Sequence, residues 1–182
     1  MRKTLAAGDG PRAHSIYGWS VNLSAAIVIS AIRISNSTCK NMVALDAAAV
    51  HIGGNPPNKT EAICQVCALL VTSGHIEPGY IESMLARELV ATTFLGNGIA
   101  VPHGLAEDCG MIRQTGVAVL QVPSGVEWNP GEKAHLVVGI AAKFDEHLDI
   151  LSKVTDVLSD ADEADRLART HEARDIAIRL SS

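Results

Sequence analysis

The stretch GVAVLQVPSGVEWNPGEKAHLVVGIA, residues 116–141, decides the fold. It contains two short apolar runs, residues 116–122 and residues 136–141, both dominated by Val, Leu, Ile and Ala. Apolar runs of about 4–8 residues that are bounded by turn residues are typical of buried strands. Residues 123–125 and 129–131 lie between the runs and contain the Pro, Gly and Asn of turns. The segment therefore predicts two buried β-strands connected by turns.

A helical pattern precedes these strands. Asn58 follows a Gly- and Pro-rich loop and is a candidate N-cap, and Glu61 completes a capping-box-like pair. The next apolar residues have helical spacing, and Ser73-Gly74 ends the pattern. The expected inward face consists of Ala62, Ile63, Val66, Cys67, Leu69 and Leu70.

Further helices are predicted on both sides of the strands. Pro78 predicts the start of a helix, and Asp145 is a candidate N-cap for another helix that ends near Leu158. Residues 160–181 predict one or two charged amphipathic helices. The expected inward residues are Ile81, Met84, Leu85 and Leu89 in the first of these helices, and Leu148, Ile150, Leu151, Val154 and Val157 in the second. Because helices and strands alternate, we predict an α/β fold: a single domain with a mixed, mostly parallel β-sheet flanked by α-helices on both faces.

Composition excludes several classes of protein. The chain has 182 residues, of which 47% are apolar, so it can form one well-packed domain plus a tail. The net charge of −5 and the absence of a long basic run argue against nucleic-acid binding. No apolar run reaches the roughly 18 residues that span a membrane, and no export signal is clear. We therefore expect a cytoplasmic protein without direct membrane insertion.

Residues 1–41 differ from the rest of the chain. They mix Gly, Ser and Arg with one short apolar run, Ala25–Ile32, which could form a strand or a short helix. We expect an N-terminal extension over residues 1–41 and the domain over residues 42–182. One hypothesis is that Met42 is the true start, and its rival is a genuine extension that packs on the domain or on a partner. Mass spectrometry of the native protein would distinguish the two.

The four cysteines do not form a convincing redox or zinc motif. Cys64 and Cys67 form a C-x-x-C pair, but no second pair follows and no strand leads into the first. Residues three apart are neighbours on a helix, so we interpret the pair as small apolar residues of a helix face. A weaker alternative is a metal or redox site built on these cysteines and histidines.

His103 is the candidate reactive residue, in the string GNGIAVPHG of residues 96–104. A phosphoryl-accepting histidine needs one unprotonated ring nitrogen, a hydrogen bond that fixes the other, and donors around the phosphoryl oxygens. Pro102 restricts the backbone before His103, and Gly104 leaves space after it. Other nearby residues offer the remaining parts: the backbone amides of Gly96 and Gly98, the hydroxyls of Thr92 and Thr93, and the guanidinium of Arg87. A histidine between Pro and Gly is also common in ordinary loops, so the residues alone leave both interpretations open.

Several long strings resemble a known family. GYIESMLARE of residues 79–88 and TTFLGNGIAVPHG of residues 92–104 closely resemble the fructose/mannitol-type enzyme IIA domain of sugar phosphotransferase systems. A second block agrees, with GVEW at 125–128, GIAAK at 139–143 and DEHL at 145–148. The likeness covers about residues 43–180 in the family's order, and it is more similar to fructose-type than to mannitol-type domains.

The resemblance implies a role for each matching residue. His103 would be the phosphohistidine nucleophile, and His147 would hydrogen-bond the phosphoryl group or orient the site. Arg87 would neutralise phosphoryl charge, and Thr93 would support a histidine or a phosphoryl oxygen. At the residue level, Arg87 could equally be an ordinary cation at a helix end, and His147 a solvated surface residue.

The resemblance also implies the reaction and its partners. HPr would donate the phosphoryl group, and an enzyme IIB domain of the sugar permease would accept it, through small and transient interfaces. No metal or cofactor is implied, because the P–N bond is exchanged directly. The alternative from another class is a regulatory protein that binds other proteins according to its phosphorylation state, and the adjacent genes would discriminate the two.

Overall fold

The computed structural model describes residues 49–143 and 146–181, except for the side chain of His147. The described residues all belong to one compact unit, Cys39–Ser182. The apolar run Ala25–Ile32 and the predicted N-cap Asp145 lie outside the described residues. None of the described helices is long and apolar enough to cross a membrane.

The centre of the fold is a five-stranded sheet with the strand order β1-β4-β5-β3-β2. Two neighbouring pairs, β1 with β4 and β3 with β5, are parallel, and the other two pairs are antiparallel. The strands are β1 (Val50–His51), β2 (Phe94–Gly96), β3 (Ile99–Ala100), β4 (Gly116–Asn129) and β5 (Glu132–Ala141).

The predicted α/β fold with a mixed sheet is confirmed, but the sheet is not mostly parallel. Its longest pairing joins β4 to β5 and is antiparallel. The reason is local: Pro130 and Gly131 form a tight turn between the two strands, with Gly131 at a φ of 78°. Strands that are joined by such a short turn form a hairpin and must run in opposite directions.

Strand β4 is longer than the sequence predicts. Residues 123–125, predicted as a turn, continue the strand instead. The pairing with β5 shifts register between Gln121 and Val126, and Gly125 adopts a φ of 69°. An irregularity of this kind, with a glycine in the left-handed region, is a bulge within a continuous strand rather than a chain reversal.

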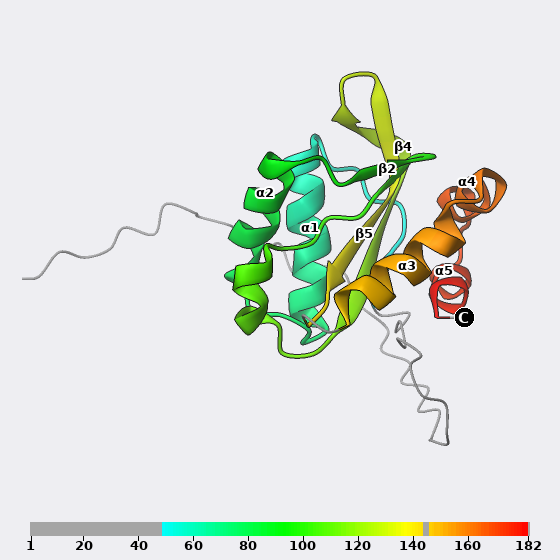
Figure 1. The fold of residues 1–182 in the computed structure, drawn as a ribbon. Coiled ribbons are helices and arrows are strands. Elements are labelled where there is room, and N and C mark those ends of the chain that lie inside the picture. The colour runs from blue at the N-terminus through cyan, green and yellow to red at the C-terminus, as the bar shows by residue number, and fades with distance from the viewer. Residues whose placement is uncertain (1–48, 144–145, 182) are drawn as a thin grey trace, which may run out of the picture. The chain divides into compact units, whose positions relative to one another are not determined.

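Helices cover both faces of the sheet, as predicted (Figure 1). Helices α1 (Lys59–Thr72) and α2 (Tyr80–Val90) lie on one face, where α1 contacts β4 and β5. Helices α3 (His147–Leu158), α4 (Ala161–Arg169) and α5 (Ala173–Leu180) lie on the other face. A 3-10 helix, Ala106–Met111, follows the segment that contains His103.

Helix α1 follows the sequence closely. The Asn58 side chain accepts a hydrogen bond from the Glu61 amide at 2.9 Å, which confirms the predicted N-cap. The helix ends before Ser73-Gly74, and Gly74 adopts a φ of 79°. At Gly139 of β5, an added Cβ atom would lie 2.8 Å from the Val66 side chain, so α1 packs directly against the sheet there.

Two helix ends differ from the predicted inward faces. Helix α2 begins at Tyr80, two residues after Pro78, and buries Met84 as predicted. At its other end, however, Leu89 is 89% exposed and Glu88 is buried in its place. In α3, Ile150 and Val154 are buried as predicted, whereas Leu148 is 77% exposed. Spacing alone does not show where a helix stops facing the core and begins to border a surface site.

Candidate functional site

His103 lies just beyond the carboxyl end of β3 and is held against β5. It forms a parallel bridge with Ile140, and the Ile140 amide donates a hydrogen bond to the Pro102 carbonyl at 3.0 Å. Pro102 has no amide of its own to donate, and its ring fixes the backbone angle before the histidine. The sheet therefore fixes the position of the His103 backbone.

The His103 ring is oriented by its own backbone. Its Nδ1 atom lies 2.9 Å from the carbonyl oxygen of Val101, and the residue is only 9% exposed. A carbonyl oxygen can only accept a hydrogen bond, so Nδ1 carries the proton in the neutral ring. The lone pair of the neutral ring then lies on Nε2, which is the nitrogen able to attack an electrophile.

Helix α2 holds the backbone that follows His103. The Tyr80 hydroxyl accepts a hydrogen bond from the Gly104 amide at 3.1 Å, and the Ser83 hydroxyl accepts one from the Leu105 amide at 2.8 Å. An added Cβ atom at Gly104 would lie 2.5 Å from the Tyr80 ring, so only glycine fits there. Burial raises the pKa of the Tyr80 hydroxyl, which therefore stays protonated at neutral pH.

A cavity of about 680 Å³ opens beside His103. Arg87 lines it, and its Nη1 atom donates a hydrogen bond to the Ala91 carbonyl at 2.9 Å. The cavity walls also include Tyr80, Val90, Gly104 and Leu148. The structure thus brings a permanently charged guanidinium and a nucleophilic imidazole to one hollow, which suits a dianionic phosphoryl group.

The role expected for His147 stays a prediction. Helix α3 begins at His147, but the side chain of this residue lies outside the described part of the structure. The next residue, Leu148, lines the cavity beside His103. The first turn of α3 therefore borders the site.

Gly96 and Gly98 do not line this cavity. They flank Asn97 in the turn between β2 and β3, with φ angles of 98° and 73°. The Gly98 carbonyl accepts hydrogen bonds from the amides of His135 and Leu136. The two glycines thus form a hairpin turn at the far end of β3, and the structure does not support the anion-binding amides that the sequence suggested.

The Thr93 hydroxyl is engaged elsewhere. It donates a hydrogen bond to the Glu88 carboxylate at 2.6 Å, and Thr93 is absent from the cavity walls. A direct contact with a phosphoryl oxygen is therefore not supported. Sequence reasoning missed Tyr80 and Ser83, which hold the backbone after His103, and the buried Glu88, which accepts the Thr93 hydrogen bond. The polar residues at 80, 83 and 88 interrupt the apolar face of α2, and this interruption was the available signal.

The cysteine pair lies in helix α1, as interpreted from the sequence. Cys67 is buried, and burial raises its pKa to about 12. Cys64 is half-buried, and burial also raises its pKa. A thiol with such a pKa is not a thiolate at neutral pH and is therefore a poor nucleophile or metal ligand. Within residues 49–143 and 146–181, no group of three or more His, Cys, Asp and Glu side chains is arranged to hold a metal ion.

Comparisons with known proteins agree with this geometry. Residues 44–182 match the family described as "Phosphoenolpyruvate-dependent sugar phosphotransferase system, EIIA 2". The chain is 54% identical over 140 residues to a multiphosphoryl transfer protein of Rhodobacter capsulatus, which covers 77% of this chain but only 17% of that protein. It is also 40% identical over 127 residues to the mannitol-specific phosphotransferase enzyme IIA component of Staphylococcus aureus, covering 70% of this chain and 88% of that protein.

Solved structures show the same fold. The crystal structure of IIA mannitol from Escherichia coli superposes with a TM-score of 0.70 at 37% identity, and the alignment covers 75% of this chain and 98% of that one. The match to the whole length of a solved enzyme IIA domain confirms the single α/β domain with helices on both faces of a mixed sheet. This chain belongs to the EIIA 2 family of the phosphoenolpyruvate-dependent sugar phosphotransferase system, a family of protein-histidine phosphotransfer components.

Proposed function

We propose that this chain accepts a phosphoryl group from phospho-HPr on Nε2 of His103 and passes it to an enzyme IIB domain, during cytoplasmic steps of fructose or mannitol uptake. The observation that carries the proposal is the 2.9 Å contact between His103 Nδ1 and the Val101 carbonyl, in a cavity shared with Arg87. This contact supports the proposal because a proton on Nδ1 leaves the lone pair of the neutral ring on Nε2. The domain relays phosphate between proteins and does not bind the sugar.

The transfer step needs no outside reagent. The Nε2 lone pair of His103 forms a new P–N bond, while the P–N bond of the donor histidine breaks and its electron pair returns to the donor ring. The onward step reverses the roles: an acceptor side chain on the IIB domain attacks phosphorus, and the electron pair of the P–N bond returns to Nε2. Positioning and charge neutralisation are then the main tasks of this protein.

Arg87 is suited to the second task. It lines the cavity, and its guanidinium remains charged at every physiological pH. A phosphoryl group in transfer spreads negative charge over its equatorial oxygens, and a planar fork of N–H donors can contact two of them. We propose that, when the phosphoryl group arrives, the Arg87 guanidinium contacts it, either by giving up its hydrogen bond to the Ala91 carbonyl or through N–H groups that this bond does not use.

Exposed apolar side chains beside the cavity support the proposal that this chain binds protein partners there. We define the apolar rim as Val90 at the end of α2 and Leu148 in the first turn of α3, which line the cavity and are 74% and 77% exposed. Exposed apolar side chains that cluster around a reactive group are typical of a docking surface. A solved complex of enzyme IIA mannitol with phosphorylated enzyme IIB mannitol from Escherichia coli, 36% identical to this chain, supports the same type of acceptor.

The proposal is tested with purified components. Incubation with labelled phosphoenolpyruvate, enzyme I and HPr should give acid-labile, base-stable phosphohistidine in the wild-type chain. His103→Ala should take up no label, whereas His171→Ala, which removes an exposed histidine between α4 and α5, should be labelled fully. Equal labelling of the His103→Ala variant would falsify the assignment.

His147 has a separate test. His147→Ala should still accept the phosphoryl group but transfer it more slowly to a IIB domain, because the first turn of α3 borders the cavity. Unchanged onward transfer would remove His147 from the mechanism.

A further inference from the structure

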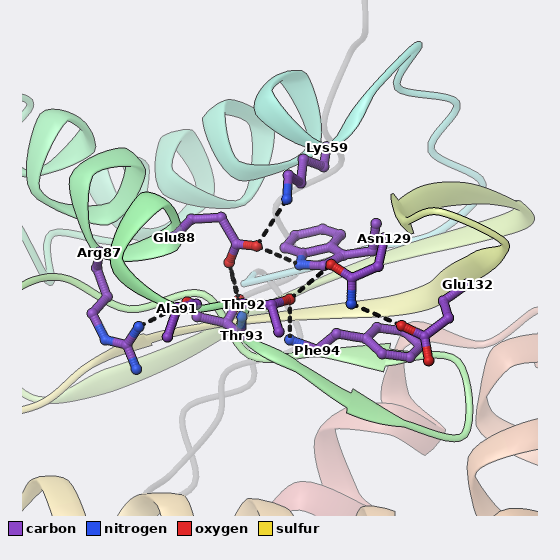
Figure 2. Close-up of polar contacts among 10 residues, drawn as sticks. Lys59, Arg87, Glu88, Ala91, Thr92, Thr93, Phe94, Asn129 and Glu132 are labelled. Atoms are coloured by element: carbon purple, nitrogen blue, oxygen red, sulfur yellow. Dashed lines mark hydrogen bonds and ion pairs between the residues drawn. The ribbon is translucent and has the colours of Figure 1, made fainter.

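Glu88 is a buried carboxylate with four hydrogen-bond donors around it. Its side chain is only 4% exposed and lies opposite Arg87 at the end of α2 (Figure 2). A carboxylate has two oxygens and about four lone-pair positions, and it can only accept hydrogen bonds. Here four donors are present, so the hydrogen-bond acceptors of the buried carboxylate are satisfied. The donors are Lys59 Nζ at 3.1 Å, Trp128 Nε1 at 3.0 Å, the Thr93 amide at 3.0 Å and the Thr93 hydroxyl at 2.6 Å.

The two oxygens of Glu88 contact different parts of the fold. Oε1 accepts from Lys59 at the start of α1 and from Trp128 in β4. Oε2 accepts both of its hydrogen bonds from Thr93, in the segment that leads from α2 into β2. One oxygen therefore joins the end of α2 to the core of the domain, and the other fixes the backbone at Thr93.

A continuous set of hydrogen bonds connects Thr93 to His103. The Thr93 carbonyl accepts a hydrogen bond from the Val101 amide at 2.9 Å. The Val101 carbonyl in turn is the acceptor for His103 Nδ1, also at 2.9 Å. A displacement of Thr93 would therefore move the carbonyl that selects the tautomer of the reactive ring.

We propose that Glu88 is a positioning residue for phosphoryl transfer, and that its Oε2 atom acts on His103 through Thr93 and Val101. The inference rests on the proposed function of His103 for its kinetic consequence, but the effect on the ring can be measured without any phosphoryl donor. Glu88 touches neither the phosphoryl group nor His103, so its role is to hold the acceptor carbonyl in place. The same carboxylate also anchors the turn of α2 that presents Arg87 to the cavity.

The connection between Glu88 and His103 is positional. Each link joins the N–H of a residue to the C=O of that same residue, so it passes through a tetrahedral Cα atom rather than along a conjugated chain. What is transmitted is therefore the location of the Val101 carbonyl. Loss of the hydrogen-bond partner that orients a metal-binding histidine typically lowers activity by about 10–100-fold, and we expect an effect of this size when the Val101 carbonyl is displaced from His103.

The two oxygens allow a matched experiment. Thr93→Val removes a hydroxyl donor from Oε2 and keeps the shape of the side chain, whereas Trp128→Phe removes one donor from Oε1. Each variant deletes one hydrogen bond to the same carboxylate, but only the first removes it from Oε2, the oxygen that also holds the Thr93 amide on the path to His103. Thr93→Ser keeps the hydroxyl and should behave as the wild type. If Thr93→Val does not fold, Thr93→Ala removes the same donor without placing a methyl group against the carboxylate.

Two measurements are made on each folded variant. The tautomer of His103 is followed by 15N NMR of the ring nitrogens in the protein alone, with His103→Ala used to assign the signals. The rate of phosphorylation by phospho-HPr is measured separately. In Thr93→Val, we expect the ring signals to shift toward the Nε2–H tautomer and the rate to fall about tenfold or more. In Trp128→Phe, we expect an unchanged tautomer and a rate within about twofold of wild type, because Lys59 still donates to Oε1 and both Oε2 contacts remain.

Every outcome decides the question. An altered tautomer in Thr93→Val together with an unaltered one in Trp128→Phe supports the proposal. Equal shifts in both variants mean a general loss of structure and overturn it, and no shift in either variant overturns it as well. If the wild type is never phosphorylated, the proposed function fails, but the tautomer comparison still tests the path from Glu88 to His103.

Discussion

Both ends of strand β3 carry glycine, but the glycines have different surroundings in the structure. At one end, Gly96-Asn97-Gly98 forms the turn from β2, and at the other end Pro102-His103-Gly104 enters the cavity. Helix α3 extends along both, because its first turn contributes Leu148 to the cavity and the Asn97 side chain donates to the Ser159 carbonyl at its far end. Twelve helical residues extend about 18 Å, so the two ends are separated by roughly that distance.

The glycines at these ends have different physical tasks. Gly98 has a φ of 73°, a conformation that residues with a Cβ atom adopt only with strain. Gly104 is required because the Tyr80 ring occupies the space of a side chain. The comparison teaches that a glycine beside a reactive residue has to be interpreted by its backbone angle and its neighbours, not by its place in a string.

The largest effect on the phosphorylation rate is expected at the end of β3 that carries His103. Gly104→Ala would place a Cβ atom 2.5 Å from the Tyr80 ring, so the ring or the backbone beside His103 has to move. Overpacking of this kind costs about 1–3 kcal/mol, and a displacement of about 1 Å at a reacting group can lower a rate about a hundredfold. Stopped-flow phosphorylation and urea unfolding would measure both. A variant that folds and is phosphorylated at the wild-type rate would contradict the close-packed site.

Tyr80→Phe should have the next largest effect. It keeps the ring and removes the acceptor of the Gly104 amide, which leaves a buried N–H without its partner. Such a loss costs about 1–3 kcal/mol in the free energy of unfolding. The phosphorylation rate should fall by less than in Gly104→Ala, because the space beside Gly104 is unchanged.

Ser83→Ala is the matched control for Tyr80→Phe. It removes the acceptor of the Leu105 amide, one residue further from His103. We expect a similar loss in the free energy of unfolding but a smaller loss in rate. A larger rate loss in Ser83→Ala than in Tyr80→Phe would show that the position of the 3-10 helix matters more than that of Gly104.

The sequence predicted the helices and strands of this fold better than the roles of the residues within them. Regular spacing and an N-cap at Asn58 located α1, because these signals are local and the structure does not override them. The exposed Leu89 and the buried Glu88 were not predictable from spacing. At the end of α2, one side of the helix packs against the core and another side borders the cavity, and spacing does not show which residue lies on which side. Likewise, the hairpin turn of residues 96–98 and the site around His103 could be separated only once β3 was known to lie between them.

Gly98→Ala tests the other end of β3. Alanine at a φ of 73° costs about 1–2 kcal/mol, and its Cβ atom would lie 3.1 Å from the His135 ring. Urea unfolding should therefore show a lower free energy of unfolding. The phosphorylation rate of the folded protein should stay within about twofold of wild type, because roughly 18 Å separate the turn from the cavity. A rate loss as large as that of Gly104→Ala would mean that the two ends of β3 act as one site after all.

The smallest effect is expected away from both ends, where Glu163 joins α4 to α5. Hydrogen bonds and ion pairs with Arg166 and Arg179, at 2.8 Å each, lower the pKa of Glu163 from its usual value of 4.5 to about 2. Between these two pH values the unfolded chain binds the proton more readily than the folded chain, so protonation favours unfolding. The contribution of Glu163 to stability is therefore fully present above about pH 4.5 and is lost as the pH falls toward 2.

Glu163→Gln removes this pH-dependent contribution. The difference in the free energy of unfolding between wild type and variant should be largest near neutral pH and should shrink between about pH 4.5 and 2, in urea titrations at several pH values. Phosphorylation of His103 at neutral pH should be unchanged, because Glu163 contributes nothing to the cavity walls. Glu172→Gln, which alters another glutamate, exposed at the start of α5, serves as the comparison variant. A constant difference across the whole pH range would show that the two arginines stabilise the helices through packing rather than through the charge of Glu163.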